Sequence, residues 1–186
     1  MSDSVNNHST RATASTTIDM SDSVVREKTV RWADPQTGTR ALRGLSGMEA
    51  MRALQSGDVS APPIVSLFGF KAEIVEPGKV TFSSVPDDTH FNLLGMVHGG
   101  TMATLLDTVM GCAVHTTLAA GRGYTTLSIS VNFIRPITLK TDKVFAEGIT
   151  VHVGRTTAIA TGRVVDAAGK LYATGETTCL LFDIAD

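Results

Sequence analysis

The chain has 186 residues and a formal net charge of −2 at pH 7; 42% of its residues are hydrophobic and 18% are charged. This length suits one domain with a sizeable core. The balanced charge gives no basic footprint for nucleic acid, and no apolar run reaches the roughly 18 residues of a membrane span. We therefore expect a protein that binds neither nucleic acid nor membrane.

The N-terminal segment is polar. Residues 1–23 are rich in Ser, Thr, Asn and Asp, and such a segment cannot bury enough apolar surface to offset its ordering entropy. It lacks the apolar region of a secretory signal, so we interpret it as the mobile tail of a cytoplasmic protein. Cys112 and Cys179 lie inside regular patterns without metal-ligand spacing, which favours reduced thiols and no metal site.

Residues 24–61 are predicted to form an N-terminal arm with one short helix. Ser46 and Glu49 fit a capping box, and Gly57 stands where the helix should stop. Between them, apolar residues recur at helical spacing: Leu45, Met48, Met51 and Leu54. The arm packs either on its own domain or on a neighbouring subunit. Residues 62–186, which begin at Pro62-Pro63, form the main domain.

The main domain is predicted to contain a β-hairpin, one long helix and three further strands. Pro77-Gly78 suits the centre of a type II turn between strands Phe68–Val75 and Val80–Val85. An apolar helical pattern covers about Gly99–Leu118. The later strands run from Gly123 to Arg135-Pro136, over Lys143–Val153, over Arg155–Val165 and over Lys170–Phe182. Strands on both sides of one apolar helix predict an α+β fold, with one antiparallel sheet wrapped around a long central helix.

Alternation in the strand that follows Gly123 predicts two different faces. The apolar face contains Leu127, Ile129, Val131 and Phe133. The opposite, polar face contains Thr126, Ser128, Ser130 and Asn132.

The most informative stretch runs from Asn92 to Asp107, where a turn-rich loop becomes the long helix. Its His98-Gly99-Gly100 junction leaves backbone N–H groups uncovered at a helix N-terminus, where developing negative charge is stabilised. Two turns later, Asp107 places a carboxylate among apolar and small residues. A donor set followed by a carboxylate favours acyl-transfer chemistry.

These residues resemble a known family. The loop Asn92-x5-His98-Gly99-Gly100, Asp107 nine residues after the histidine, and a strand ending in residues 132–136 are similar to the hotdog-fold acyl-CoA thioesterases of the PaaI type. The resemblance covers about residues 62–184. It implies a hotdog fold with an N-terminal extension, and acyl- or aryl-CoA thioesters as substrates. It implies no cofactor beyond the coenzyme A of the substrate itself.

The resemblance also implies residue roles. The Gly99 backbone N–H would bind the thioester carbonyl oxygen, and the Asn92 side chain would place or polarise it. Asp107 would act either as the nucleophile or as the general base for a water. Thr126 falls where some relatives have a serine that helps to hold that water. The family is typically a dimer of dimers, so a homotetramer is expected.

Helix geometry supports shared sites without reference to the family. Gly99 and Asp107 are eight residues apart, which separates them by about 12 Å along one helix. Both groups must come within about 3 Å of one reacting centre. One subunit cannot supply both, so two antiparallel helices across a two-fold axis are expected to form two composite sites.

Four further residues are candidates for substrate binding. His98 and Gly100 lie in the donor loop, where His98 is expected to fix the loop rather than to act as a general base. Arg135 and Arg155 lie near strand ends and either contact the phosphates of coenzyme A or are solvated surface residues. An apolar slot for the acyl group is expected from Met96, Met102 and Phe91.

Two alternatives compete with hydrolysis. A hotdog-fold dehydratase or hydratase resembles His-Phe-Pro-Gly followed by a helical glutamate fourteen residues after the histidine. Here His90-Phe91 continues as Asn92, and the position fourteen after His90 is Thr104. The second alternative is a non-catalytic domain that binds acyl-CoA. The residues discriminate neither the acyl group nor the two roles of Asp107.

Overall fold

The computed structural model describes residues 20–21 and 23–184. Most of the expected mobile tail, residues 1–19 and 22, lies outside the described residues. The main domain is one six-stranded antiparallel sheet in the order β1-β2-β4-β5-β6-β3. Its strands are β1 (Lys71–Glu76), β2 (Lys79–Ser84), β3 (Arg122–Phe133), β4 (Val144–Val153), β5 (Thr157–Asp166) and β6 (Leu171–Asp183).

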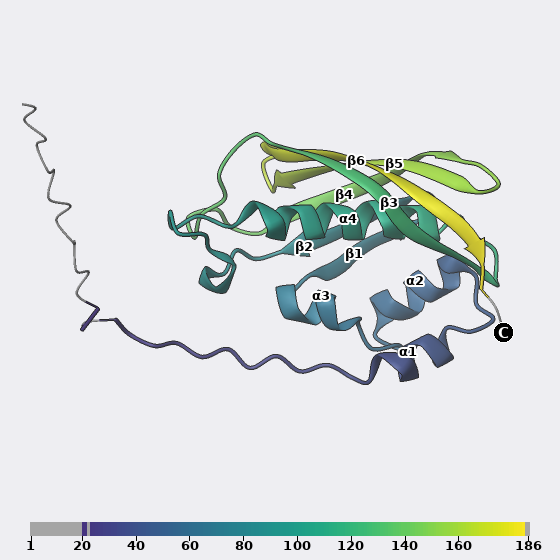
Figure 1. Ribbon diagram of the computed structural model, residues 1–186, viewed down its shortest axis with the longest axis horizontal. Helices are drawn as coiled ribbons and strands as arrows, with labels where there is room; N and C mark the ends of the chain where they lie inside the picture. Colours follow the sequence, from purple (N-terminus) through teal and green to yellow (C-terminus); the bar gives the residue numbers. More distant parts are fainter. Residues whose placement is uncertain (1–19, 22, 185–186) are drawn as a thin grey trace, which may run out of the picture.

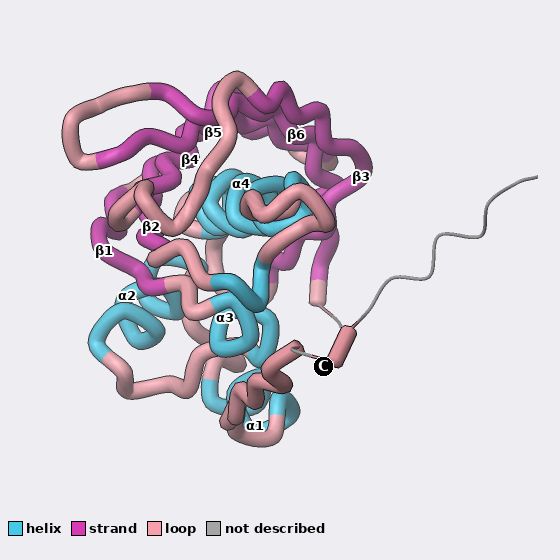
Figure 2. The backbone as a smooth tube through the Cα atoms, turned by 90° about the vertical axis from the view of Figure 1, so that its left-hand side faces the viewer, coloured by secondary structure: helices cyan, strands magenta, loops and turns pink. Residues whose placement is uncertain are grey.

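The sheet curves around one long helix, α4 (Gly99–His115), and the N-terminal helices lie on the side that the sheet leaves open (Figures 1 and 2). These are α1 (Pro35–Ala41), α2 (Gly47–Ser56) and α3 (Pro63–Phe68). The predicted α+β fold is confirmed. The described helices include none that is long and apolar enough to cross a membrane.

The helix packs against the sheet through an apolar face that is inaccessible to solvent. Its fully buried side chains are Leu105, Leu106, Val109, Met110, Ala113 and Val114. Burying each of the larger ones contributes roughly 1.5–3 kcal/mol. This face holds the core of the domain.

Three glycines allow the helix to approach the sheet this closely. Gly148 of β4 pairs with Gly162 of β5, which pairs with Gly175 of β6. A Cβ atom at Gly148 would overlap the backbone of Val109. At Gly162 it would lie 2.9 Å from the Met110 Cγ atom. The row of glycines is therefore a shallow trough across the sheet in which α4 lies.

The N-terminal arm packs on its own domain, at the C-terminal end of α4. The predicted capping box is present, since Ser46 and Glu49 accept hydrogen bonds from each other's backbone N–H groups. The Gly47 N–H donates to the Leu118 carbonyl at 3.0 Å. A Cβ atom at Gly47 would overlap the His115 carbonyl, so α2 and the end of α4 touch backbone to backbone.

Three details of the predicted elements are wrong. Phe68 does not begin a strand; it ends α3, which starts with Pro63 in the first turn and stops at Gly69 in the left-handed region. The long helix ends at His115, because Thr116 follows as a cap rather than as a further turn. Helix α1 was not expected, although Asp34 before Pro35 is a common helix start.

A β-bulge at Leu127 changes the faces of β3. The register with β6 shifts between Thr126 and Ser128, so Leu127 is an extra residue and the alternation restarts after it. Thr126 therefore faces α4, on the same side as Val131 and Phe133, and not on the opposite face as the alternating pattern indicated.

We predict that Gly148→Ala lowers the free energy of unfolding by roughly 3 kcal/mol or more, because its Cβ atom meets helix backbone that cannot move aside. Gly162→Ala is the comparison; its Cβ would meet side-chain atoms of Met110 and Leu106 and no backbone, and a smaller cost of about 1–2 kcal/mol is expected. Urea denaturation of both variants measures the difference. Equal costs would show that the Val109 backbone does not limit the approach of α4 more than the side chains at Gly162 do.

Candidate active site

The first turn of α4 presents one uncommitted backbone donor. His98 is the N-cap residue, and its Nδ1 atom accepts a hydrogen bond from the Gly100 N–H at 2.9 Å. The His98 carbonyl accepts from the Thr101 N–H at 3.0 Å. The Gly99 N–H has no hydrogen-bond partner among the described residues. Since the helix dipole adds partial positive charge here, Gly99 offers an aimed donor for an oxyanion.

This cap gives His98 a structural contact. A side chain whose Nδ1 accepts from a backbone N–H ties the loop to the helix, which is the contact that the expected role of fixing the loop requires. The same bond occupies the Gly100 N–H, so Gly99 rather than Gly100 is the donor that remains.

Asn92 combines a turn role with a free donor. Its Oδ1 atom accepts hydrogen bonds from the backbone N–H groups of Leu94 at 2.8 Å and Met96 at 3.3 Å. The Asn92 N–H in turn donates to the Met96 carbonyl at 2.8 Å. The two hydrogen bonds to Oδ1 orient the amide, and its NH₂ group has no partner among the described residues. The turn that Asn92 forms therefore holds its NH₂ group in a fixed position, where it is available to a substrate.

Asn92 and Gly99 line the same cavity, which has a volume of about 320 Å³. The Phe133 ring forms one wall and lies so close that a Cβ atom at Gly99 would be 3.1 Å from it. Met96 and Met102 line the cavity as expected, whereas Phe91 does not. Phe133 and Tyr172 also line the cavity, and the sequence had assigned neither of them to the site.

The predicted carboxylate lies elsewhere in the same chain. Asp107 is half-buried, and the Thr126 hydroxyl donates to its Oδ1 atom at 2.8 Å. Neither residue lines the cavity that holds Gly99. Thr126 lies two residues after Tyr124, which also faces α4, and the bulge at Leu127 brings Phe133 to that same side further along the strand. One subunit thus contains two free donors, the Gly99 N–H and the Asn92 amide, which we call the donor pair. At a separate position it contains the Asp107 carboxylate with the Thr126 hydroxyl bonded to it.

The two predicted arginines are at opposite ends of β3. Arg135 follows the end of the strand, lines the cavity with Gly99, and donates to the Leu171 carbonyl at 2.6 Å. Arg155 lies in the turn between β4 and β5, where its carbonyl accepts from Arg122 at the start of β3. Only Arg135 is therefore near the donor pair of its own chain.

The described part of the chain contains no group of three His, Cys, Asp or Glu side chains that could hold a metal ion. Its two histidines with lowered pKa values, His90 and His115, owe that shift first to burial. Neither lines the cavity with Gly99.

Comparison with known proteins identifies the family. Residues 94–173, which contain α4 and most of the sheet, match the model of the thioesterase superfamily. The human protein acyl-coenzyme A thioesterase 13 is 35% identical over 108 residues, which cover 55% of this chain and 72% of the human protein. The chain belongs to the thioesterase superfamily. The resemblance inferred from the donor loop and Asp107 is thereby confirmed, and the protein is a thioester hydrolase.

Two solved structures show how far this thioesterase follows the family fold. A phenylacetic acid degradation-related protein of Ralstonia eutropha JMP134 superposes with a TM-score of 0.64 and 26% identity, covering 69% of this chain and 97% of that one. A Streptococcus mutans UA159 protein bound to acetyl-CoA gives a TM-score of 0.57 and 27% identity, covering 63% and 91%. Almost all of each relative is matched, whereas about a third of this thioesterase has no counterpart in them.

We predict that His98 contributes to activity by capping α4 and not by acting as a general base. His98→Ala should cost about 1 kcal/mol of stability by removing the acceptor for the Gly100 N–H. His98→Asn restores a good N-cap and should keep both stability and kcat/KM close to those of the wild type. A stable His98→Asn protein that hydrolyses no thioester would instead identify His98 as a general base. Thermal denaturation and thiol-release kinetics measure the two properties.

Proposed function

We propose that this thioesterase hydrolyses acyl- or aryl-CoA thioesters to the free acid and coenzyme A, at composite sites shared by two subunits. The observation that carries the proposal is the free Gly99 N–H beside the free Asn92 amide in one cavity. The name of the human relative, acyl-coenzyme A thioesterase 13, and the acetyl-CoA bound by the Streptococcus mutans relative support coenzyme A thioesters as the substrate class.

The donor pair accounts for stabilisation of the intermediate. With the thioester carbonyl oxygen at the Gly99 N–H and the Asn92 amide, negative charge that develops on the oxygen meets two donors already in position. One such donor is typically worth about 10²–10³ in rate. When the tetrahedral intermediate collapses, the C–S bond breaks and coenzyme A leaves as a thiolate, which needs no strong general acid.

Asp107 supplies the attacking oxygen in either of two ways. As a general base it takes a proton from a water whose oxygen bonds to the carbonyl carbon. As a nucleophile it bonds to that carbon itself, and water then hydrolyses the anhydride. Both routes release the same acid and thiolate. Thr126 donates to one carboxylate oxygen, so it orients Asp107 and leaves the other oxygen for the reaction.

The partner subunit completes the site. Gly99 and Asp107 are separated by about 12 Å along α4, so the Asp107 that faces Gly99 must come from a second chain. Strand β3, which contacts Asp107 through Thr126, is an edge of the sheet. It exposes apolar side chains, among them Leu127 and Phe133. A long exposed edge with apolar residues is suited to pairing with another copy of itself.

The polar end of coenzyme A has a matching surface next to the donor pair. Arg135 belongs to the cavity with Gly99 and also to an adjoining hollow, whose charged lining residues are Lys140, Lys143, Lys170, Asp142 and Asp166. Lys143 is paired with Glu73 at 2.7 Å. Arg135, Lys140 and Lys170 are the cations we assign to the phosphates. Arg155 could take part only from a partner subunit.

Other properties remain predictions from the sequence. They are the homotetramer, the cytoplasmic location and the absence of a cofactor beyond the coenzyme A of the substrate. The alternative of a dehydratase has little support, because Thr104, at the position of the required acid, donates its hydroxyl to the Gly100 carbonyl at 2.9 Å.

We predict that Asp107→Asn lowers kcat/KM for acyl-CoA substrates by several orders of magnitude, because the amide neither accepts a proton nor attacks efficiently. The fold should persist, since an amide still accepts the Thr126 hydrogen bond. Thiol release from a panel of aryl- and alkyl-CoA substrates measures the loss. Unimpaired hydrolysis by the variant would remove Asp107 from the mechanism.

We predict that two inactive variants rescue each other. Mixing Asp107→Ala chains with Gly99→Pro chains gives hybrid dimers with one intact site, so about a quarter of wild-type activity should return. Proline removes the N–H and is tolerated at the first helical position. Gly99→Ala is the control, because it adds a Cβ atom against Phe133 but keeps the donor. Hybrids that form without regaining activity would contradict the composite site.

A further inference from the structure

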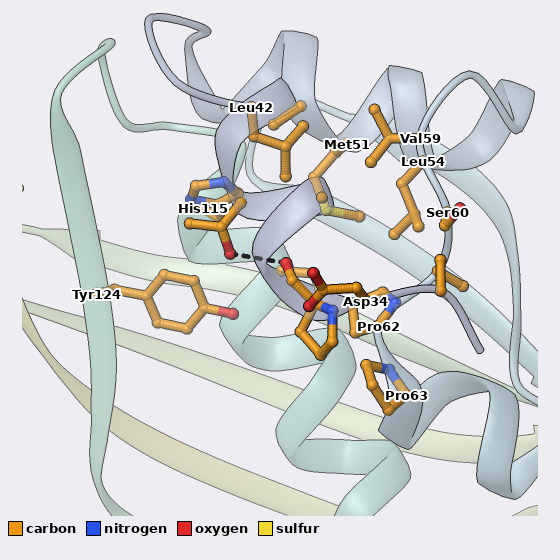
Figure 3. Close-up of a pocket in the computed structure, with 17 residues that line it drawn as sticks. Asp34, Leu42, Met51, Leu54, Val59, Ser60, Pro62, Pro63, His115 and Tyr124 are labelled. Atoms are coloured by element: carbon orange, nitrogen blue, oxygen red, sulfur yellow. Dashed lines mark hydrogen bonds between the residues drawn. The ribbon is translucent and has the colours of Figure 1, made fainter.

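A second cavity, of about 310 Å³, lies between the N-terminal arm and the C-terminal half of α4. The domain contributes Cys112, His115 and Tyr124 to its walls. The arm contributes mostly apolar side chains, and Figure 3 labels four of them: Leu42, Met51, Leu54 and Val59. The residues that we assign to the reaction do not line it; these are Asn92, Gly99, Asp107 and Thr126. The cavity is therefore separate from the candidate active site.

The lining of this cavity has one charged group. Asp34, in the loop before α1, is the only Asp, Glu, Lys or Arg among the lining residues, and it is exposed at the opening. Burial lowers the pKa of His115, which favours its neutral form. Burial also raises the pKa of the Cys112 thiol to about 12 and the pKa of Tyr124 well above its usual value. An apolar space with a single negative charge at its opening results.

Half of the Asp34 carboxylate is uncommitted. Its Oδ1 atom caps α1 by accepting a hydrogen bond from the Gln36 N–H at 3.0 Å. Its Oδ2 atom has no hydrogen-bond or ion-pair partner among the described residues. Figure 3 shows the carboxylate and the Tyr124 hydroxyl both directed into the space between arm and domain. A carboxylate oxygen in this position is a ready acceptor for a cationic donor, which forms the stronger, charge-assisted kind of hydrogen bond.

We propose that this cavity binds a small primary amine with a compact apolar body. The ammonium group donates to Asp34 Oδ2 at the opening, and the apolar body lies between α2 and the C-terminal half of α4. A few polar groups that fix the orientation of a largely apolar guest are typical of small-molecule sites. A carboxylic acid, including the acid released by a thioesterase, is disfavoured here because it places a second negative charge beside Asp34.

The size of the cavity restricts the amine. At about 310 Å³ the cavity is at the small end of ligand pockets. A Cβ atom at Gly47 would overlap the His115 carbonyl, so α2 and α4 already touch backbone to backbone beside the cavity. The space cannot widen without separating the arm from the helix. It therefore suits one aromatic ring or a short alkyl chain, and a bound amine contacts arm and domain at once.

We predict that the full chain binds 2-phenylethylamine with a Kd of about 1 mM or tighter. Phenylacetate, which has a similar body and the opposite charge, should bind about 10-fold more weakly or not at all. Isothermal titration calorimetry measures both affinities. Because the amine binds the folded chain, it should also raise the unfolding temperature as its concentration increases. Equal affinities for the two compounds, or no binding of the amine, would overturn the proposal.

Asp34→Asn tests the carboxylate directly. Asparagine caps a helix as well as aspartate does, so the variant removes the charge and keeps α1. It should weaken 2-phenylethylamine binding about fivefold. Asp58→Asn is the matched control, because it removes a carboxylate from the same arm outside the cavity, and it should leave the affinity unchanged. Equal losses in the two variants would mean that only the overall charge matters, and the site would be wrong.

Val59→Trp tests the apolar part of the cavity by filling it from the arm. It should abolish binding of 2-phenylethylamine, whereas Leu67→Trp, which places the same ring on an exposed part of α3 outside the cavity, should not. Binding that survives Val59→Trp would locate the amine elsewhere on the protein and contradict the proposal. If Val59→Trp does not fold, the comparison of Asp34→Asn with Asp58→Asn decides alone.

Discussion

The close approach of α4 to the sheet is the constraint on which the other features of this protein depend. Gly148, Gly162 and Gly175 stand side by side on three neighbouring strands, and their missing side chains let the helix lie against the sheet backbone. A buried helix at this depth has a fixed position and rotation, because protein interiors are close-packed. The first turn of α4 is therefore held beside Phe133, and Asp107 is held beside Thr126.

One helix consequently serves two sites. Its N-terminus supplies a donor and its middle supplies a carboxylate, and their separation is a property of helix geometry that no side-chain rotation can change. The proposed reaction therefore requires two subunits to associate, because each site needs Gly99 from one and Asp107 from the other. The unpaired edge of β3, adjacent to Asp107, is where we expect that association to occur.

The sequence predicted the features that have a strong period or a specific motif. The apolar pattern of α4, the capping box at Ser46 and the hairpin at Pro77-Gly78 were all found, because each has a local physical cause. The bulge at Leu127 was missed, since the alternation of residues 126–133 continues through it without a break. The short apolar run of α3 was interpreted as a strand, and only Pro63 and Gly69 at its ends indicate a helix.

The site was predictable in part for the same reason. Gly99, Asn92 and Asp107 belong to a motif within 16 residues of sequence. Phe133 and Tyr172 join the cavity only because β3 pairs with β6, which brings the ends of distant strands together. The cavity between residues 33–63 and the domain has no local signature at all, because it exists only where five separate segments meet.

The contact between Gly47 and the His115 carbonyl has a consequence for the N-terminal arm. It attaches the arm to the same helix that carries Gly99 and Asp107. Any larger residue at position 47 would push the arm away from α4, because its Cβ atom would meet backbone that cannot move aside.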